Sequence, residues 1–194
     1  DFLAEAGQPY TFYDRRNTQV VTPAGTLKTT YAIPLSMAKG AEALAQKSSC
    51  LLIDFKGLKG YSARQIAEML KSQWPRLHHQ GISLPGGRTK LFGVQWPRSL
   101  EVAATRQQLA EAVRPFIKDA KLVGFPAIMG IYRVQDILAD LERKLGVDIF
   151  ELPTMPPAIT GLRIREAFEN RLPQKGVRTF YQQRVMSVEV QKGG

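Results

Sequence analysis

The sequence has one cysteine, no long apolar run and no familiar nucleotide-binding glycine motif. Cys50 cannot form an internal disulfide, and its place in an apolar run fits a buried thiol in a reducing compartment. No apolar stretch approaches the roughly 20 residues of a membrane-spanning helix, so direct membrane insertion is not expected. The first residues show neither an initiator methionine nor a signal-peptide pattern, and we expect a piece of a longer chain.

Several chemical signatures are also missing. Neither G-x-G-x-x-G nor G-x-x-x-x-G-K-[ST] occurs, so neither a dinucleotide site nor a P-loop can be recognised. His78 and His79 have no Cys or carboxylate neighbours at metal-ligand spacing, and we expect two surface histidines and no metal. No Ser-His-Asp set or G-x-S-x-G motif indicates a nucleophilic serine.

Positive charge, in contrast, is in excess. The chain has 27 Lys and Arg against 17 Asp and Glu, a net charge of +10, which can attract phosphates, acidic partners or nucleic acid by long-range steering. The basic residues are scattered, and neither zinc-finger spacing nor a glycine-aromatic RNA motif is present. A solvated basic surface is therefore the expected interpretation, and nucleic-acid binding is the lesser alternative.

The middle of the chain alternates short apolar runs with helical patterns. The 194 residues, 44% of them apolar, can bury a substantial core. Four strand–helix units in a row predict an α/β fold, with a mostly parallel, Rossmann-like sheet, right-handed crossovers and helices on its faces. The predicted strands are Cys50–Phe55, 90–95, 121–125 and Asp148–Leu152.

The expected helices have recognisable ends and faces. Ser62 is expected to cap the first, with Gln65 at the capping-box position, and Pro115 should disturb the second, which begins at Ser99. Gly146 is placed to end the third. The expected buried faces comprise Ala63, Ile66, Ala67, Leu70 and Trp74; then Val134, Ile137, Leu138, Leu141 and Leu145; and finally Ile164, Ala167, Phe168 and Leu172.

Both ends of the chain favour β-structure. Residues 20–33 carry β-branched and aromatic side chains around a Pro- and Gly-containing turn, which predicts a hairpin or bend. Residues 177–181 and 184–190 show the same composition in partial alternation, which predicts strands. We therefore expect an α/β lobe at 48–175 and a small β platform to which residues 1–47 and 176–194 both contribute.

Two connections are candidate ligand sites. After the strand Asp148–Leu152, Pro156 and Pro157 suit a rigid approach to a helix whose free N–H groups attract anions, although an ordinary strand–helix connection explains the spacing equally well. Lys56 and Gly57 follow the first predicted strand, where ligands of open α/β sheets bind. They form a possible phosphate loop, for which a flexible basic loop is the alternative.

Three stretches resemble one family when taken together. They are T-P-A-G-T-L-K-T-T at 22–30, F-P-A-I-M-G at 125–130 and L-P-T-M-P-P-A-I-T-G-L-R at 152–163. In order and approximate spacing they are similar to the B subunit of the anaerobic, quinone-linked glycerol-3-phosphate dehydrogenase, a flavoprotein. The resemblance covers residues 20–190. It implies that the family's flavin-binding Rossmann halves lie before and after this central, substrate-side region.

The resemblance also implies an activity. The intact protein would oxidise sn-glycerol 3-phosphate to dihydroxyacetone phosphate and pass electrons through FAD or FMN toward quinone, with other dehydrogenase subunits as partners. A cytoplasmic location follows, or a peripheral one at the inner membrane through a partner subunit. The glycine fingerprint and the C-terminal flavin-contacting segment are missing, so we expect the isolated chain to be inactive and without bound flavin.

A dianionic substrate needs cations and N–H donors. Lys28, Arg163 and the helix start near Pro157 meet that need, while the catalytic residues stay unassigned. The alternative function is a non-catalytic α/β module that binds a phosphorylated ligand or a partner protein. The residues that the resemblance places toward substrate or flavin are Thr22, Gly25, Thr26, Lys28, Thr29, Pro156, Pro157, Thr160, Gly161 and Arg163.

Overall fold

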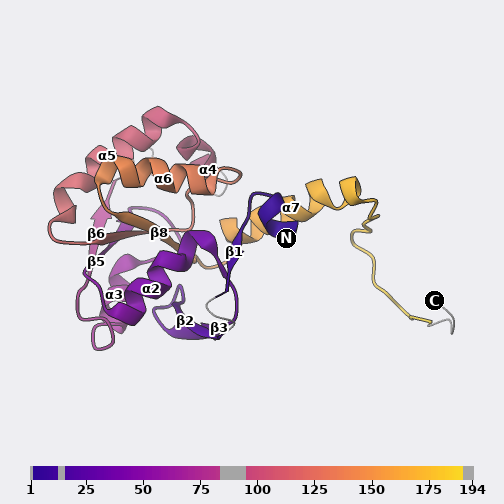
Figure 1. Ribbon diagram of the computed structural model, residues 1–194, viewed down its shortest axis with the longest axis horizontal. Helices are drawn as coiled ribbons and strands as arrows, with labels where there is room; N and C mark the ends of the chain where they lie inside the picture. The colour runs from indigo at the N-terminus through magenta and orange to yellow at the C-terminus, as the bar shows by residue number, and fades with distance from the viewer. Residues whose placement is uncertain (1, 13–15, 84–94, 190–194) are drawn as a thin grey trace.

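A four-stranded parallel sheet forms the centre of the molecule in the computed structural model, which describes residues 2–12, 16–83 and 95–189 (Figure 1). Its strand order is β6 (Leu77–Ile82), β5 (Cys50–Phe55), β7 (Leu122–Pro126) and β8 (Asp148–Leu152). Cys50 lies opposite Leu77 on one side and Leu122 on the other. The predicted α/β fold with a mostly parallel sheet is therefore confirmed.

Both faces of this sheet are covered by helices. Leu51, Ile53 and Phe55 belong to one core cluster, whereas Cys50 and Leu52, which alternate with them along β5, belong to another. Figure 1 shows α5 (Ala103–Ile117) and α6 (Val134–Leu145) over one face, and α2 (Ala38–Gln46) and α3 (Ala63–Met69) over the opposite face. This two-sided burial explains why β5 and β7 are near-continuous apolar runs.

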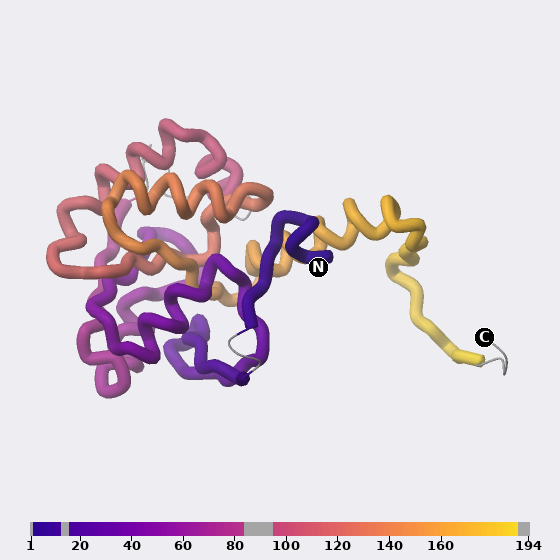
Figure 2. The backbone as a smooth tube through the Cα atoms, viewed as in Figure 1, coloured from indigo at the N-terminus to yellow at the C-terminus, as the bar shows by residue number. Residues whose placement is uncertain are grey.

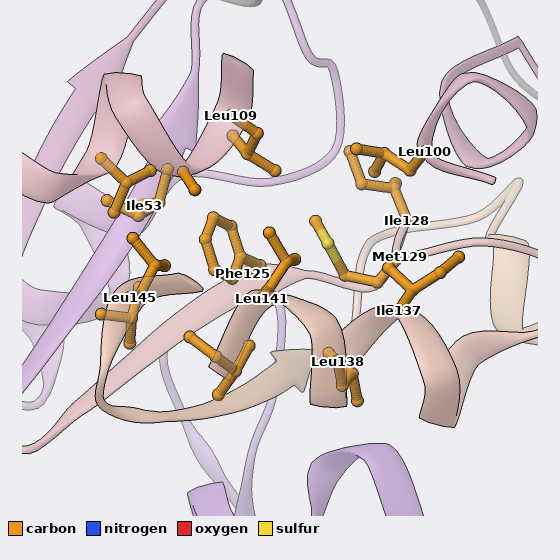
Figure 3. Packing of buried hydrophobic residues seen from close by; sticks show 14 of the residues in the cluster. Ile53, Leu100, Leu109, Phe125, Ile128, Met129, Ile137, Leu138, Leu141 and Leu145 are labelled. Atoms are coloured by element: carbon orange, nitrogen blue, oxygen red, sulfur yellow. The ribbon is translucent and has the colours of Figure 1, made fainter. Parts of the chain in front are cut away.

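The helix α6 matches its prediction closely. All five predicted apolar residues are buried, and the helix ends at Gly146 with φ 72°, a left-handed conformation that glycine adopts without a Cβ clash. In Figure 3 the side chains of Ile137 and Leu141 point toward the same space as Phe125 and Met129 from the sheet side. The 3.6-residue period of the sequence therefore corresponds to a real packing surface.

The first predicted helix is also confirmed. Gln65 donates its backbone N–H to the hydroxyl of Ser62 at 3.2 Å, and the residues predicted to share its inner face, including Leu70 and Trp74, are buried. The side chain of Gln65 donates to the carbonyl of Ala24 at 3.3 Å, so it tethers this helix to the turn at 22–26.

The second strand lies where the sequence did not indicate it. The strand predicted at 90–95 falls outside the described residues except for Gln95, which begins α4 (Gln95–Leu100). The strand β6 takes that place in the sheet. It buries only its first and last residues, Leu77 and Ile82, because it lies at an edge. His78 and His79 are exposed, as predicted, and no cluster of metal-ligating side chains occurs in the described parts of the chain.

The helix predicted from Ser99 is divided in two. The helix α4 ends at Leu100, and α5 begins at Ala103 after a short break. Pro115 lies in the last turn of α5, which continues through it to Ile117, so the break lies before α5 and not at Pro115 as the sequence suggested. The division was not visible in the hydrophobic period because Leu100 and Leu109 are buried in the same cluster.

The N-terminal part forms two small antiparallel sheets. The strand β1 (Tyr10–Thr11) pairs with β4 (Ile33–Pro34), and β2 (Thr18–Val21) pairs with β3 (Leu27–Thr30) to form the predicted hairpin. A short 3₁₀ helix, η1 (Leu35–Met37), then leads into α2. The small helix α1 (Phe2–Glu5) begins the described chain.

The C-terminal part differs most from its prediction. The helix α7 (Ile159–Arg171) and η2 (Pro173–Lys175) point away from the sheet, with α1 alongside α7 (Figure 2). Of the predicted apolar face of α7, only Ala167 is buried, while Phe168 is 42% exposed. Most of this face meets no neighbouring layer, because the helix extends beyond the sheet.

The strands predicted at 177–181 and 184–190 are wrong as far as the described residues reach. No strand occurs between 176 and 189, because no second strand is adjacent to supply the backbone hydrogen bonds. The expected C-terminal contribution to the β platform is therefore not seen. The division into a lobe at 48–175 and a platform stays a prediction.

None of the helices in the described ranges is long and apolar enough to cross a membrane.

Candidate functional site

A cavity of about 480 Å³ lies beside β8, bounded by the β2–β3 hairpin, α2 and the start of α7. This volume is within the range typical of small-molecule sites, roughly 300–1,000 Å³. Apolar side chains such as Val21, Ile33, Phe150 and Leu152 line most of it. The cavity is therefore the candidate site, and its few polar groups determine what it can bind.

The structure brings two of the three family-like stretches together at this cavity. Of the ten predicted residues, Thr22, Lys28, Thr160 and Gly161 line it. The functional roles of all ten stay predictions. The other six do not line the cavity; they are Gly25, Thr26, Thr29, Pro156, Pro157 and Arg163.

Gly25 and Thr26 build the hairpin turn. A Cβ on Gly25 would lie 2.9 Å from the Cβ of Met69, and the residue has φ 80°, so the turn packs against α3 only because no side chain intervenes. The hydroxyl groups of Thr22 and Thr26 are 2.8 Å apart and hydrogen-bonded. These contacts hold the T-P-A-G-T segment in place, so that Thr22 faces the cavity.

The polar groups at the cavity favour an anion, because the one carboxylate residue among its described lining residues, Glu151, is neutralised by Arg163. Among the described residues, no side chain caps the N-terminus of α7, so the first N–H groups of this 13-residue helix remain available. A Cβ on Gly161 would meet no atom within 4 Å, which leaves room for close approach. Thr154 is only 9% exposed at the cavity wall, and its hydroxyl has no hydrogen bond within the described ranges. An anion at this helix end would find N–H, hydroxyl and ammonium donors together.

Lys28 supplies that ammonium group. It is an exposed residue on β3 that borders the cavity, and the described residues offer it no ion pair or hydrogen bond. Its charge is thus not neutralised by a neighbouring carboxylate of the described chain.

Arg163 lies elsewhere, in a buried network. Its Nη1 and Nη2 atoms donate to the two carboxylate oxygens of Glu151 at 2.7 and 2.8 Å, and its Nε and Nη2 atoms donate to the carbonyl of Gly130 at 2.9 and 2.7 Å. Glu151 also accepts the backbone N–H of Met129 at 2.8 Å. The side chains of Arg163 and Glu151 are 4% and 0% exposed.

This network changes the role that we assign to Arg163. All three guanidinium nitrogens are already engaged with protein oxygens, whereas the predicted phosphate contact needs donors facing a ligand. The ion pair instead ties α7 to β8 and to the loop after β7, the second family-like stretch. Sequence reasoning did not single out Glu151. Its position in the apolar strand β8 is nevertheless a signal in the sequence, because a carboxylate that is buried there requires a positively charged or hydrogen-bonding partner elsewhere in the chain.

The turn after β5 tests whether the chain can hold the diphosphate of a dinucleotide cofactor. In dinucleotide-binding folds this group lies at the N-terminus of the helix that follows the first strand. Here that end of α3 is occupied by the Ser62 hydroxyl and by Asp54, whose carboxylate accepts the N–H of Ala63 at 3.0 Å. Burial raises the pKa of Asp54. A diphosphate does not fit here, because the N–H groups that it would need are already bound to the Asp54 carboxylate and the Ser62 hydroxyl, and its charge would lie beside that carboxylate.

Lys56 and Gly57 belong to this same turn. The Lys56 N–H donates to the Ile82 carbonyl at 2.9 Å, and the turn is closed by an N–H···O bond from Leu58 to Phe55 at 3.0 Å. Neither Lys56 nor Gly57 lines the 480 Å³ cavity. Their phosphate-binding role stays a prediction, and the structure does not bring them to the candidate site.

Residues 1–190 match the family model described as "FAD binding domain", and the chain belongs to this family of flavin-binding proteins. Its relatives narrow the likeness to one enzyme, the anaerobic glycerol-3-phosphate dehydrogenase. The chain is 29% identical over 194 residues to the probable B subunit of this enzyme from Halobacterium salinarum, covering 92% of this chain and 44% of that protein. It is 28% identical over 188 residues to the B subunit from Vibrio vulnificus, covering 91% of this chain and 42% of that protein.

The resemblance carried by the three stretches is thus confirmed. A third relative, the B subunit of the same enzyme from Actinobacillus pleuropneumoniae, is 28% identical over 176 residues, covering 83% of this chain and 40% of that protein. The chain spans less than half the length of the relatives it matches.

Proposed function

We propose that this chain is the substrate-side domain of a flavin-dependent oxidoreductase that acts on a small phosphorylated alcohol, with sn-glycerol 3-phosphate as the first candidate. The observation that carries the proposal is the cavity beside β8, where two family-like stretches meet around an uncapped helix N-terminus and a lysine. The names of the relatives suggest the substrate.

In this proposal the phosphate group lies at the N-terminus of α7. Backbone N–H groups there, the hydroxyl groups of Thr154 and Thr160, and the ammonium group of Lys28 are the donors around it. The carbon skeleton lies against the apolar wall formed by side chains such as Phe150 and Leu152. The Glu151–Arg163 pair supports the site without touching the ligand, because it holds the helix that offers the N–H groups.

The flavin, when bound in the intact protein, accepts the electrons. The β5–α3 turn does not fit a diphosphate, so we do not place that group of the flavin at this turn. The residues of the chain then bind and orient the substrate and exclude water from it. Transfer of electrons toward quinone through other subunits is part of the same proposal, by likeness to the relatives.

Calorimetric titration of the 194-residue chain with glycerol 3-phosphate tests the site. We expect Lys28→Ala to weaken binding about tenfold or more, because loss of a charge-assisted contact costs roughly 1.5–3 kcal/mol and about 1.4 kcal/mol is a factor of ten. Lys71→Ala, a matched change of an exposed lysine outside the cavity, should leave binding unchanged. Equal affinities for the parent and both variants would place the phosphate site elsewhere.

A second measurement separates catalysis from binding alone. In the intact flavoprotein, anaerobic addition of glycerol 3-phosphate should bleach the absorbance of the oxidised flavin, and glycerol should not. Binding without bleaching would favour the alternative, a non-catalytic module that holds a phosphorylated ligand.

A further inference from the structure

A second, much smaller space adjoins the candidate cavity. This side pocket measures about 20 Å³ and lies between β1, η1 and the starts of α6 and α7. Figure 1 shows β1 next to the start of α7. The residues Tyr10, Pro34, Thr160 and Ile164 line both the side pocket and the 480 Å³ cavity, so the two spaces share a wall.

Hydroxyl-bearing residues are prominent around the side pocket. They are Tyr10, Ser36 and Thr160, and Ser36 is only 5% exposed. Within the described ranges, none of these three hydroxyl groups forms a hydrogen bond. A buried hydroxyl group without a partner costs free energy, and most such groups in proteins have one. The side pocket is therefore suited to an occupant that forms hydrogen bonds.

The volume and the charge of the side pocket limit this occupant. A water-sized group needs roughly 10–15 Å³ by this measure, so the pocket has room for one such group and not for a phosphate with its four oxygen atoms. Among the described residues that line it, Arg163 alone carries a charge, and that charge is paired with Glu151. A single neutral polar group, such as a hydroxyl, fits both limits.

Tyr10 contributes a hydrogen-bond donor to the side pocket. Burial raises the pKa of its phenol, and the positive charge of Arg163 opposes this only in part. Since the ordinary pKa of tyrosine is already about 10, the phenol stays protonated at neutral pH. The hydroxyl groups of Ser36 and Thr160 can donate or accept, so a ligand hydroxyl can find a donor and an acceptor together.

The side pocket extends the proposed substrate site along α7. Thr160 lies in the first turn of this helix, at the proposed phosphate position, and Ile164 lies about one turn, or roughly 6 Å, farther along the axis. A short carbon chain can therefore connect a phosphate at the helix N-terminus with a hydroxyl in the side pocket. The hydroxyl that is oxidised must lie beside the flavin, for which the side pocket has no room, so the pocket suits a hydroxyl that does not react.

We propose that the side pocket is a specificity subsite in which Tyr10 and Ser36 bind the terminal, non-reacting hydroxyl of a phosphorylated polyol. The inference rests on the proposed function for the position of the phosphate. It narrows the substrate class to phosphate esters that carry a further hydroxyl beyond the reacting carbon. A site built to hydrogen-bond a hydroxyl discriminates against the analogue without it, because the groups of the protein are then left unpaired.

Calorimetric titration of the 194-residue chain with two esters tests the subsite. The ester 2-hydroxypropyl phosphate, in the matching configuration, lacks only the terminal hydroxyl of glycerol 3-phosphate. We expect the parent chain to bind glycerol 3-phosphate about tenfold or more tightly than this analogue. Equal affinities would overturn the subsite and leave the phosphate site intact, because the side pocket would then hold only water. Failure of both esters to bind would overturn the proposed function and the subsite together.

Substitutions then assign the preference to the side pocket. Tyr10→Phe removes one oxygen atom and should weaken binding of glycerol 3-phosphate about fivefold or more, with little change for the analogue. Ser36→Ala should act in the same direction. Tyr31→Phe removes the same group from a tyrosine that is 48% exposed and lines neither space, and it should change neither affinity.

The same titrations contain the contradicting results. A full preference for glycerol 3-phosphate in both Tyr10→Phe and Ser36→Ala would show that the terminal hydroxyl binds elsewhere. Equal weakening of both esters by Tyr10→Phe would show that Tyr10 only supports the cavity wall. Lys28→Ala should weaken both esters to the same extent, because both carry the phosphate, so an error in the phosphate site and an error in the subsite give different results.

Discussion

The helices α6 and α7 have 12 and 13 residues and each lies next to β8 in the sequence, yet they are held in opposite ways. The inner face of α6 consists of five apolar residues. At the centre of the three-residue buried stripe of α7 is Arg163, paired with Glu151. The first helix is fixed by burial of apolar surface, and the second by a buried ion pair.

The two helices therefore contribute in different ways, α6 to the stability of the core and α7 to the position of the candidate site. A fully buried apolar side chain stabilises by about 1.5–3 kcal/mol, so α6 contributes strongly to the core. A buried ion pair contributes little net stability, because desolvation offsets the attraction, although removal of one partner is costly. The pair in α7 instead specifies where the first turn lies, next to the candidate cavity. The rest of α7 extends outward.

The largest expected effect comes from breaking this pair. Arg163→Ala should lower the free energy of unfolding by about 3–5 kcal/mol, because the carboxylate of Glu151 remains buried without a partner. Urea unfolding of the isolated chain, followed by circular dichroism, measures this loss. Arg165→Ala, on the exposed side of the same helix, removes only a surface pair with Glu169 and should leave the unfolding midpoint almost unchanged.

A double substitution distinguishes pairing from packing. Glu151→Met combined with Arg163→Met should recover part of the stability lost in Arg163→Ala, since two apolar groups of similar size need no partner, whereas the N–H of Met129 and the carbonyl of Gly130 lose theirs. If Arg163→Ala behaves like Arg165→Ala, the ion pair does not hold α7, and the contrast with α6 disappears.

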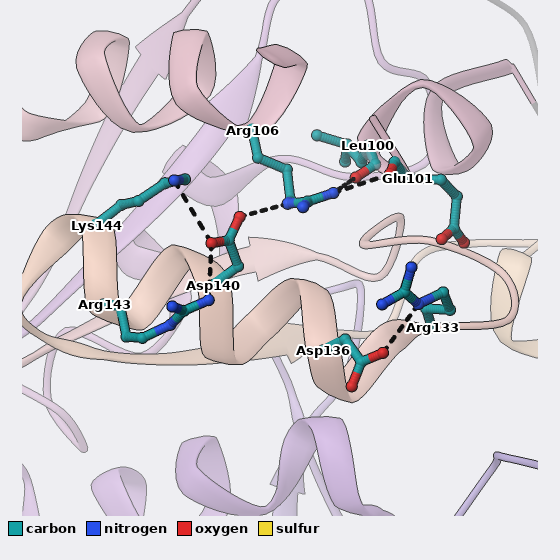
Figure 4. Close-up of polar contacts among 8 residues, drawn as sticks. All are labelled: Leu100, Glu101, Arg106, Arg133, Asp136, Asp140, Arg143 and Lys144. Carbon is teal, nitrogen blue, oxygen red and sulfur yellow. Dashed lines mark hydrogen bonds and ion pairs between the residues drawn. The ribbon is translucent and has the colours of Figure 1, made fainter. Parts of the chain in front are cut away.

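A smaller effect involves the side of α6 that faces α5, where Asp140 forms an ion-pair network (Figure 4). Its carboxylate accepts from Arg106 Nε at 2.6 Å and from Arg143 Nη2 at 3.0 Å, and Lys144 Nζ lies 3.5 Å away. The hydrogen bond from Arg106 lowers the pKa of Asp140, and burial opposes this only in part. A carboxyl group whose pKa is lowered by folding stabilises the protein above its unfolded pKa, which is about 3.9.

That stability should be lost as the pH falls through the lowered pKa of Asp140. We therefore expect Asp140→Asn to be about 1 kcal/mol less stable than the parent near pH 7, with the difference shrinking toward zero once the pH lies below the lowered pKa of Asp140. Urea unfolding at a series of pH values measures it. Asp136→Asn, which removes an exposed pair with Arg133, should change the stability near pH 7 by much less. A difference that grows in acid would contradict the assigned sign.

The sequence predicts those elements whose apolar residues meet a core. The strands β5, β7 and β8 follow from apolar runs because they are buried along most of their length, and α6 follows from its 3.6-residue period because its apolar face is buried. The edge strand β6 escaped prediction, since its centre, H-H-Q-G, is polar and exposed. Residues 177–181 and 184–190 had a strand pattern, but no strand forms there as far as the described residues reach, because a strand also needs a neighbour that no local pattern supplies.

The roles of the candidate site residues stay predictions. What the structure adds is that Thr22, Lys28, Thr160 and Gly161, from two separate stretches of the sequence, line one cavity. The role of Arg163 could not be inferred from its own helix, because its partner Glu151 lies on a strand twelve residues earlier. Long-range pairing of this kind is decided by the fold and not by local sequence.

The smallest expected effect concerns the outer half of α7. Phe168 is 42% exposed, and its ring meets that of Phe2, which belongs to a helix of only four residues that can adjust. Phe168→Ala should therefore lower the free energy of unfolding of the isolated chain by less than about 1 kcal/mol. Phe125→Ala, in the core of Figure 3, should cost about 3–5 kcal/mol in the same urea experiment. Comparable losses would show that α1 and the outer half of α7 unfold together with the core, and the difference between the two helices would then be one of composition alone.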